Sequence, residues 1–471
     1  MSIATGLAQR VYGTTYESLP AETIDWAKIA LLDYVGVTLA GSLETGPRLV
    51  ERSFKNSGCS GKSLVFGRRR RTSASEAAVI NGTSSHVLDF DDCSNTIGGH
   101  PSVSILPALI ALGEQQHASG RDILAAYVAG YEVEARLGHA VNLHHYEKGW
   151  HPTATLGVFG CAAACAKLMG LDAAQTAYAI AIAASLASGI KANFGTMVKS
   201  LHVGHCARSG LFAAELAQEG FDASTLAFEH KQGFFNVFNG EGNYRADKVL
   251  EAWGSPYDML SPGIALKQYP CCASTHPAID ATVELVRKCG LRPESVERIE
   301  TWTHKRRLQH TNRPDPQTSL DAKFSVQYCV SRALMHGAVK LEHFQGDAHL
   351  DPALRQVLAK VRSEIYTEAQ FPKENHYGAE VRLTTTDGRS YSAKVDQPHG
   401  RTAKNPLSPQ MLKVKFEDCA TRVLDAKDTA LVYDLIEKAD EISDIMALTS
   451  LLENIRERPV SHADGARVVA A

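Results

Sequence analysis

Apolar residues recur at helical spacing through the first half of the chain. The clearest run covers residues 24–39, where apolar side chains return every three or four positions until Gly41 ends the pattern. Ser73 and Asp172, each followed three residues later by glutamate or glutamine, have the signature of helix N-termini. Small residues dominate several of these segments, so we expect the helices to pack closely in a bundle.

Alternation of apolar and polar positions replaces helical spacing in the second half. Residues 296–304 are rich in threonine, isoleucine and tryptophan, which predicts a strand. Residues 379–395 alternate on both sides of an Asp-Gly pair, which predicts a hairpin with a tight turn. Helical spacing then returns over residues 408–452.

This order of elements predicts a mainly α fold with two domains, as expected for 471 residues. We expect one large all-helical domain, built from residues 1–265 and 398–471. A smaller α+β domain, residues 266–397, is inserted between these two parts. We expect the tail, residues 459–471, to fray.

Composition narrows the range of partners. The formal net charge is −3, so the chain lacks the basic excess that a nucleic-acid partner would require. The opening residues have no secretory signal pattern, and polar residues interrupt the most apolar stretch, residues 173–190, which favours a buried helix over a membrane span. Ten scattered cysteines without CxxC spacing indicate a reducing compartment, and hence a cytoplasmic protein without a zinc site.

An acidic segment, residues 89–92, is the first candidate for chemistry. It carries three carboxylates directly after an apolar helix, and His100 follows within a short loop. Three interpretations stay open: a solvated turn or helix cap, a divalent-metal site, or an acid/base pair in which Asp89 or Asp91 tunes His100.

Two further segments carry candidate residues. His151 lies before a predicted helix, where it is either a simple cap or a proton-transfer group. Lys199 follows a glycine turn among apolar residues, and His202 stands three positions later, so both can reach one anion on a helix. A solvated lysine is the plainer interpretation, but burial of an ammonium among apolar side chains requires a counter-charge.

Five motifs in this order resemble the MmgE/PrpD family, and the likeness covers nearly the whole chain. They are residues 89–92 with 100–102, then 149–151, 193–202, 269–272 and 321–325. The family includes 2-methylcitrate dehydratases, cis-aconitate decarboxylases and iminodisuccinate epimerases. The motifs are specific to the family and poorly specific to one reaction within it.

The resemblance implies a large helical domain, a smaller α+β lid, a homodimer, and an active site between the domains that needs no metal and no organic cofactor. Cys93 and Cys272 depart from the animal aconitate decarboxylases, which carry threonine and histidine there. The family's site positions fall on Asp89, Cys93, His100, His151, Lys199, Lys267, Cys272 and Tyr328.

The residue types suit proton transfer beside a carboxylate. Lysines and histidines can hold a polycarboxylate, while a base and an acid move protons. We assign catalysis to His100, His151, Asp89 and Tyr328, and substrate binding to Lys199, Lys267, His202, Cys93 and Cys272. The sequence therefore predicts a cofactor-independent lyase that removes water or CO2 from a small di- or tricarboxylate. An epimerase of an amino- or imino-dicarboxylate is the alternative, and a catalytically silent binding protein is a third hypothesis.

Overall fold

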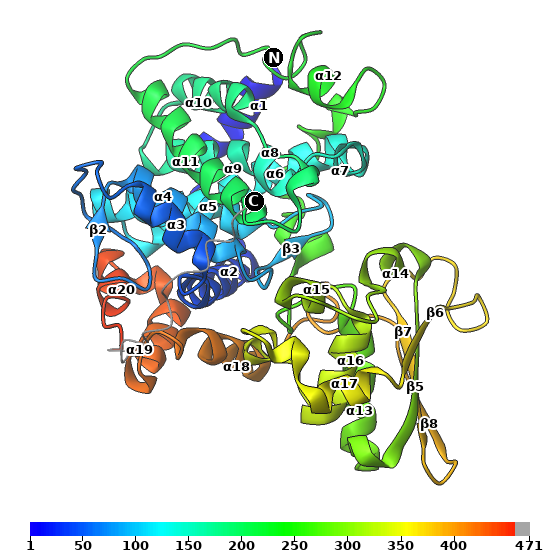
Figure 1. The fold of residues 1–471 in the computed structure, drawn as a ribbon. Helices are drawn as coiled ribbons and strands as arrows, with labels where there is room; N and C mark the ends of the chain where they lie inside the picture. Colours follow the sequence, from blue (N-terminus) through cyan, green and yellow to red (C-terminus); the bar gives the residue numbers. More distant parts are fainter. Residues whose placement is uncertain (457–471) are drawn as a thin grey trace, which may run out of the picture.

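The computed structural model describes residues 1–456 and has a mainly α fold, as the sequence predicts. A large helical lobe and a smaller lobe that carries a sheet lie side by side (Figure 1). The large lobe begins with α1 (Ile3–Gly13), α2 (Ala21–Gly41), α3 (Thr45–Ser53), α4 (Ala74–His86), α5 (Pro101–Gln116), α6 (Gly120–Val141), α7 (His144–Lys148), α8 (Pro152–Thr155), α9 (Gly157–Leu168), α10 (Ala173–Leu186), α11 (Val198–Gln218) and α12 (Phe234–Asn239).

Small residues let two of these helices approach closely. A Cβ atom added to Gly82 on α4 would lie 2.8 Å from the Cα atom of Gly204 on α11, so a larger residue would push the helices apart. The start of α11 also lies beside the end of α4, because Lys199 contacts the carboxylate of Asp89, three residues after His86.

The smaller lobe holds a four-stranded sheet in the order β6-β5-β7-β8. Strands β5 and β6 are parallel, and the other pairs are antiparallel, with Leu383 opposite Tyr391 in the predicted hairpin. Helices α13 and α16 cover one face of the sheet (Figure 1). The elements are α13 (His276–Cys289), β5 (Val296–Thr303), α14 (Lys305–Thr311), α15 (Ser319–Lys323), α16 (Val326–His336), α17 (Pro352–Leu358), β6 (Val361–Ile365), β7 (Ala379–Thr385) and β8 (Ser390–Val395).

The chain returns to the large lobe through α18 (Pro409–Ala420), α19 (Ala426–Glu437) and α20 (Met446–Leu451). Phe416 of α18 belongs to the same apolar core as Leu31 and Leu32 of α2. Lys415 forms a buried ion pair with Asp33 of α2, at 2.5 Å. The exact domain boundaries at residues 265 and 397 stay predictions.

The described part of the chain also holds two short strand pairs: β1 (Ser63–Leu64) with β2 (Arg71–Thr72), and β3 (Cys93–Ser94) with β4 (Ile264–Ala265). Within residues 1–456, no single helix is both long and apolar enough to cross a membrane, although α2 and α3, bent by 83° at their junction, would pass that test as a pair. The predicted fraying of residues 459–471 falls outside the described residues.

Candidate active site

The acidic segment forms a buried loop that follows α4. Asp89 adopts a left-handed backbone conformation, with φ of 54°, which aspartate tolerates better than most residues. Three buried lysines, all from later parts of the chain, donate hydrogen bonds to three consecutive carbonyl oxygens of this loop. Lys323 binds the Leu88 oxygen at 2.6 Å, Lys267 the Asp89 oxygen at 2.7 Å and Lys415 the Phe90 oxygen at 2.8 Å.

The Asp89 carboxylate holds two ammonium groups. Lys199 Nζ lies 2.7 Å from Oδ1, and Lys267 Nζ lies 3.0 Å from Oδ2. Burial opposes the charge on Asp89, but the two lysines outweigh burial and hold the pKa of this carboxyl well below its usual range. Both lysines that the sequence assigned to the substrate thus converge on one carboxylate.

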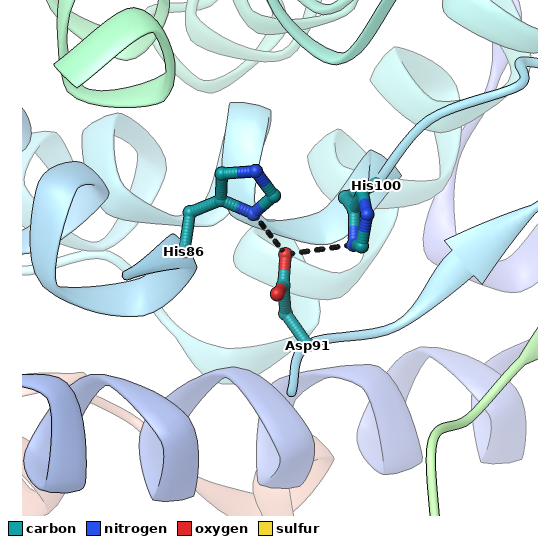
Figure 2. Close-up of side chains that lie close together, drawn as sticks. All are labelled: His86, Asp91 and His100. Carbon is teal, nitrogen blue, oxygen red and sulfur yellow. Dashed lines mark hydrogen bonds and ion pairs between the residues drawn. The ribbon is translucent and has the colours of Figure 1, made fainter. Parts of the chain in front are cut away.

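Asp91 lies between two imidazoles (Figure 2). Its Oδ2 atom is 2.7 Å from His86 Nδ1 and 3.0 Å from His100 Nδ1. Despite burial, the two imidazoles hold the pKa of Asp91 well below its usual range. The sequence left open whether Asp89 or Asp91 tunes His100. Asp91 makes the closer contact, because Asp89 Oδ1 is 3.8 Å from His100 Nε2.

The two imidazoles differ in protonation. Burial lowers the pKa of His86 to about 4 in spite of Asp91. For His100, Asp91 outweighs burial and raises the pKa to about 10. At neutral pH, His100 is therefore an imidazolium, while His86 is neutral and donates through Nδ1. The Nε2 atom of His86 is buried without a hydrogen-bond partner among the described residues.

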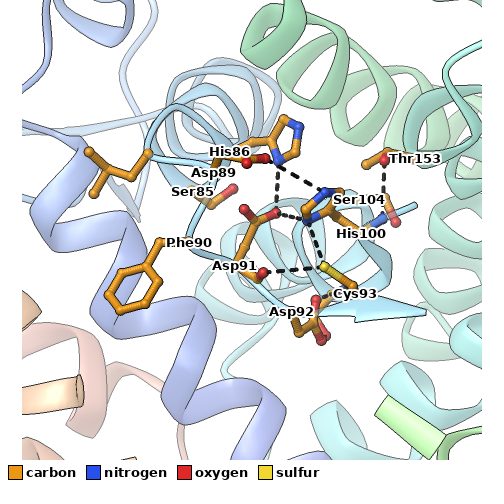
Figure 3. Close-up of polar contacts among 12 residues, drawn as sticks. Ser85, His86, Asp89, Phe90, Asp91, Asp92, Cys93, His100, Ser104 and Thr153 are labelled. Carbon is orange, nitrogen blue, oxygen red and sulfur yellow. Dashed lines mark hydrogen bonds and ion pairs between the residues drawn. The ribbon is translucent and has the colours of Figure 1, made fainter. Parts of the chain in front are cut away.

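Cys93 lies beside the same nitrogen of His100 that Asp91 contacts (Figure 3). Strand β3 holds it against β4, and its Sγ atom is 3.8 Å from His100 Nδ1. Burial raises the pKa of the thiol, but His100 and Lys267 outweigh burial and bring it down to about 7. A pocket beside the thiol is lined by Lys267, His276 and Arg401 among others.

His151 and His202 form a second imidazole pair. Their Nδ1 atoms are 3.2 Å apart, and the His151 ring lies edge-on to Phe194, with 4.8 Å between centroids. The His151 and His86 centroids are 5.6 Å apart. Burial, reinforced by neighbouring cations, holds the pKa of His151 well below its usual range, so this ring is neutral and can accept a proton.

The remaining two predicted residues are Cys272, just before α13, and Tyr328 of α16 in the smaller lobe. The Cys272 backbone N–H donates to the Lys323 carbonyl at 2.9 Å, and burial raises the pKa of its thiol. Tyr328 packs in the core of the smaller lobe, where its hydroxyl donates to the His343 carbonyl and accepts from Arg332. A catalytic role for Tyr328 stays a prediction.

Three residues in the site were not among the predicted site residues: His86, Asp91 as the closer partner of His100, and Lys323. His86 closes a helix five positions before Asp91, a spacing too common to identify a site. Lys323 stood within one of the family motifs, but only the tertiary fold shows that it is buried against the loop. Its burial lowers the pKa of this ammonium to about 8.

The arrangement can both hold an anion and transfer protons. Lys199, Lys267 and the His100 imidazolium carry three positive charges against the two carboxylates Asp89 and Asp91, which favours an anionic ligand. Neutral His151 and charged His100 supply a proton acceptor and a proton donor. The ligand atoms of His86, Asp91 and His100 also lie within 4.8 Å of one another, a spacing that could hold a metal ion.

Comparisons with known proteins match almost the full chain. The family model of the MmgE/PrpD N-terminal domain matches residues 5–247, and that of the MmgE/PrpD C-terminal domain matches residues 269–440. A cis-aconitate decarboxylase from Homo sapiens is 30% identical over 464 residues, which cover 96% of this chain and 95% of that protein. The Mus musculus cis-aconitate decarboxylase is 30% identical over 468 residues, covering 96% and 93%. An Aspergillus terreus cis-aconitate decarboxylase is 26% identical over 461 residues, 93% of each chain.

Proposed function

Because this chain belongs to the MmgE/PrpD family, we propose that it is a cofactor-independent lyase that releases CO2 from a small unsaturated tricarboxylate of the cis-aconitate type. The relatives named above support a decarboxylase over other activities of the family. The observation that carries the proposal is the convergence of Lys199, Lys267 and the His100 imidazolium. A polycarboxylate needs this number of fixed cations in a nearly dry site.

Substrate binding would use the two ammonium groups that Asp89 now holds. A substrate carboxylate must share or replace the contacts of Asp89 with Lys199 and Lys267. Asp89 thereby keeps the two lysines in position before substrate arrives, which lowers the cost of organising them. Arg401, which lines the neighbouring pocket, is placed for a further carboxylate.

The chemical step would need one carboxylate without a cationic partner. The C–C bond to that carboxylate breaks, CO2 leaves, and the electron pair delocalises into the unsaturated acid. His100 then donates a proton to carbon, and Asp91 stabilises the imidazolium before the transfer. A catalytic acid with its pKa raised to about 10 is protonated throughout the neutral range.

Dehydration of a hydroxylated tricarboxylate is the second candidate. The observation that favours it is Cys272, a thiol where the animal aconitate decarboxylases carry an imidazole. In that reaction neutral His151 would take the proton from carbon, and His100 would protonate the leaving hydroxyl.

The test is a substrate panel followed by proton NMR. The purified chain is incubated separately with cis-aconitate, citrate, 2-methylcitrate and iminodisuccinate. We expect turnover of cis-aconitate with loss of CO2. Turnover of only citrate or 2-methylcitrate would make the chain a dehydratase, and turnover of only iminodisuccinate an epimerase. Binding of the panel without turnover would establish a silent binding protein.

We also propose a cytoplasmic location and a homodimer. The ten cysteines are all unpaired in the structure, which suits a reducing compartment.

A further inference from the structure

Two arginines of this chain lie against one tyrosine ring. The Arg307 Cζ atom is 4.6 Å from the ring centroid of Tyr377, and the Arg401 Cζ atom is 4.9 Å from it. Arg307 belongs to α14 of the smaller lobe, and Arg401 to the segment by which the chain returns to the large lobe. We propose that the two guanidinium groups form a second anion subsite, which binds a substrate carboxylate other than the one on Lys199 and Lys267.

Arg401 connects this arginine pair to the catalytic site. It lines the same pocket as Cys93 and Lys267. Its Nη2 atom donates a hydrogen bond to Oδ1 of Asn95, which lies in the loop before α5. Lys267 and Arg401 thus face one pocket, so one ligand can contact both cations.

The positive charge of the pair is not neutralised by the chain. Within residues 1–456, the printed side-chain hydrogen bonds go to neutral acceptors: Arg307 binds the His376 carbonyl and the Ser274 hydroxyl, and Arg401 binds the Asn95 amide. In the same part of the chain, the Nε atom of Arg401 is buried without a hydrogen-bond partner, which is costly for a donor. Burial and the nearby charge of Arg401 lower the pKa of Arg307 to about 10. An anion that accepts from both groups would relieve each of these costs.

The donors favour a carboxylate. A guanidinium group presents paired N–H donors that match the two oxygens of a carboxylate, and such charge-assisted bonds are stronger than a bond to a neutral amide. A substrate carboxylate would therefore replace Asn95 as the acceptor on Arg401.

The count of subsites fits a tricarboxylate, and this step rests on the proposed function. One carboxylate binds Lys199 and Lys267, and a second binds the arginine pair. The third then has no cationic partner, which is the condition that loss of CO2 requires. The subsite thus determines which carboxylate leaves.

Tricarballylate provides a readout that is independent of turnover. It is a saturated tricarboxylate without a hydroxyl group, so it can undergo neither proposed reaction. Isothermal titration calorimetry of the full-length chain should show binding, and Arg401→Gln and Arg307→Gln should each weaken it by about 10- to 100-fold. Arg287→Gln, at an exposed position of α13, is the control and should bind as the wild type does.

Asn95→Ala separates ligand binding from support of the fold. This variant removes the same hydrogen bond from Arg401 but keeps the guanidinium group. It should bind tricarballylate at least as tightly as the wild type, because the ligand no longer competes with Asn95. Circular dichroism checks that each variant folds. Equal weakening in Asn95→Ala and Arg401→Gln, wild-type affinity in folded Arg401→Gln, or a wild-type chain that binds no tricarballylate would overturn the subsite.

Kinetics distinguish failure of the subsite from failure of the proposed function. On cis-aconitate, Arg401→Gln should raise KM by about 10- to 100-fold. Turnover of cis-aconitate with an unchanged KM in this variant would overturn the subsite and leave the proposed function intact. An inactive substrate panel, together with tricarballylate binding that depends on Arg401, would contradict the proposed function and support the subsite.

Discussion

Three neighbouring carboxylates in one loop have different protonation states because each meets different partners. Asp89 faces two ammonium groups and Asp91 faces two imidazoles, so both are ionised. Asp92 accepts a hydrogen bond from the Ser102 hydroxyl, but burial and the nearby Asp33 raise its pKa well above the usual range. The loop therefore places two negative charges where they hold cations and disfavours a charge on the third carboxyl.

Lys199→Met tests substrate binding. The variant removes one ammonium from the pair on Asp89, so we expect KM to rise strongly. Removal of a charge-assisted hydrogen bond in a partly dry site costs about 2–4 kcal/mol, or roughly 30- to 1,000-fold in kcat/KM. Steady-state kinetics provide the measurement. Lys288→Met, at an exposed position paired with Glu284, is the control, and an unchanged KM in Lys199→Met would refute the binding role.

His151→Ala tests proton transfer. The neutral ring lies beside His86 and Phe194 in the site, and removal of a positioned acid/base group lowers kcat by about 10²- to 10⁴-fold. His230→Ala is the control, because His230 is exposed. If folded His151→Ala kept the wild-type kcat, His151 would have no part in the chemistry.

The pH profile tests the pairing of Asp91 with His100. As the acid, His100 loses its proton when pH rises through about 10, so wild-type kcat should fall there. The same raised pKa means that the stabilisation from this ion pair is complete below the ordinary histidine pKa and is lost as pH rises through about 10. In Asp91→Asn, no carboxylate at position 91 opposes the effect of burial on the pKa of His100. That pKa should fall, and the alkaline limb of kcat should move to lower pH. A profile that is identical in both proteins would exclude His100 as the acid.

At the scale of elements, the acidic loop depends on distant parts of the chain. Lys323 of α15, Lys267 just after β4 and Lys415 of α18 each satisfy a buried carbonyl of the loop. Buried backbone carbonyls without partners are costly. The left-handed conformation of Asp89 is thus held by contacts that form only when both lobes and the C-terminal helices are in place.

Lys415→Met tests this support. The substitution leaves Asp33 buried without a counter-charge, and loss of one partner of a buried ion pair costs about 3–5 kcal/mol. Urea unfolding should therefore show a large loss of stability, while Lys427→Met at an exposed position of α19 should show little. Adding Asp33→Asn to Lys415→Met should recover part of the loss. Equal stability of Lys415→Met and wild type would contradict the structural role.

Local elements could be predicted from the sequence, and the contacts between them could not. The end of α2 at Gly41, the cap of α10 at Asp172 and the β7–β8 hairpin follow from spacing, capping and turn residues. The start of α2 is less regular than its end: a 3-10 turn ends at Ser18, and α2 begins after Pro20. The pairing of β3 with β4 joins residues about 170 positions apart along the chain, and no local pattern specifies it.

The same limit applies to the site. The family motifs identified the lysines and histidines by their order in the chain, but not which partner each would meet. The contact of Asp91 with two rings depends on how the end of α4 meets the start of α5, because His86 ends α4 and His100 precedes α5. The pKa of each carboxyl in the loop depends on burial and on neighbouring charges, and both arise only in the folded chain.

At the scale of the whole molecule, the site joins distant parts of the chain. His86, His100, His151 and Lys199 come from the large lobe. Lys323 comes from the smaller lobe, and Lys267 from the segment that leads into it. Lys323 and Lys267 contact the loop of the large lobe directly. A change in the relative position of the two lobes would therefore move the ammonium groups of Lys323 and Lys267. We expect substrate binding to be coupled to that position.

The outer face of α11 provides the last test, which concerns the proposed homodimer. Leu201 and Phe212 lie on one side of this helix, three turns apart, and are 38% and 49% exposed. Met197, just before the helix, is 52% exposed. Exposed His205 and Arg208 lie between Leu201 and Phe212 on this face. Exposed apolar side chains with an arginine among them are typical of an interface, so we predict that a second copy of this chain covers the face. Light scattering after size-exclusion chromatography should show a dimer for the wild type and a monomer for Phe212→Glu, because a buried unpaired carboxylate would disrupt the interface.

Leu431→Glu, at a leucine of α19 that is 43% exposed, should remain dimeric. A monomeric wild type would refute the homodimer, and a dimeric, folded Phe212→Glu would place the interface on another face.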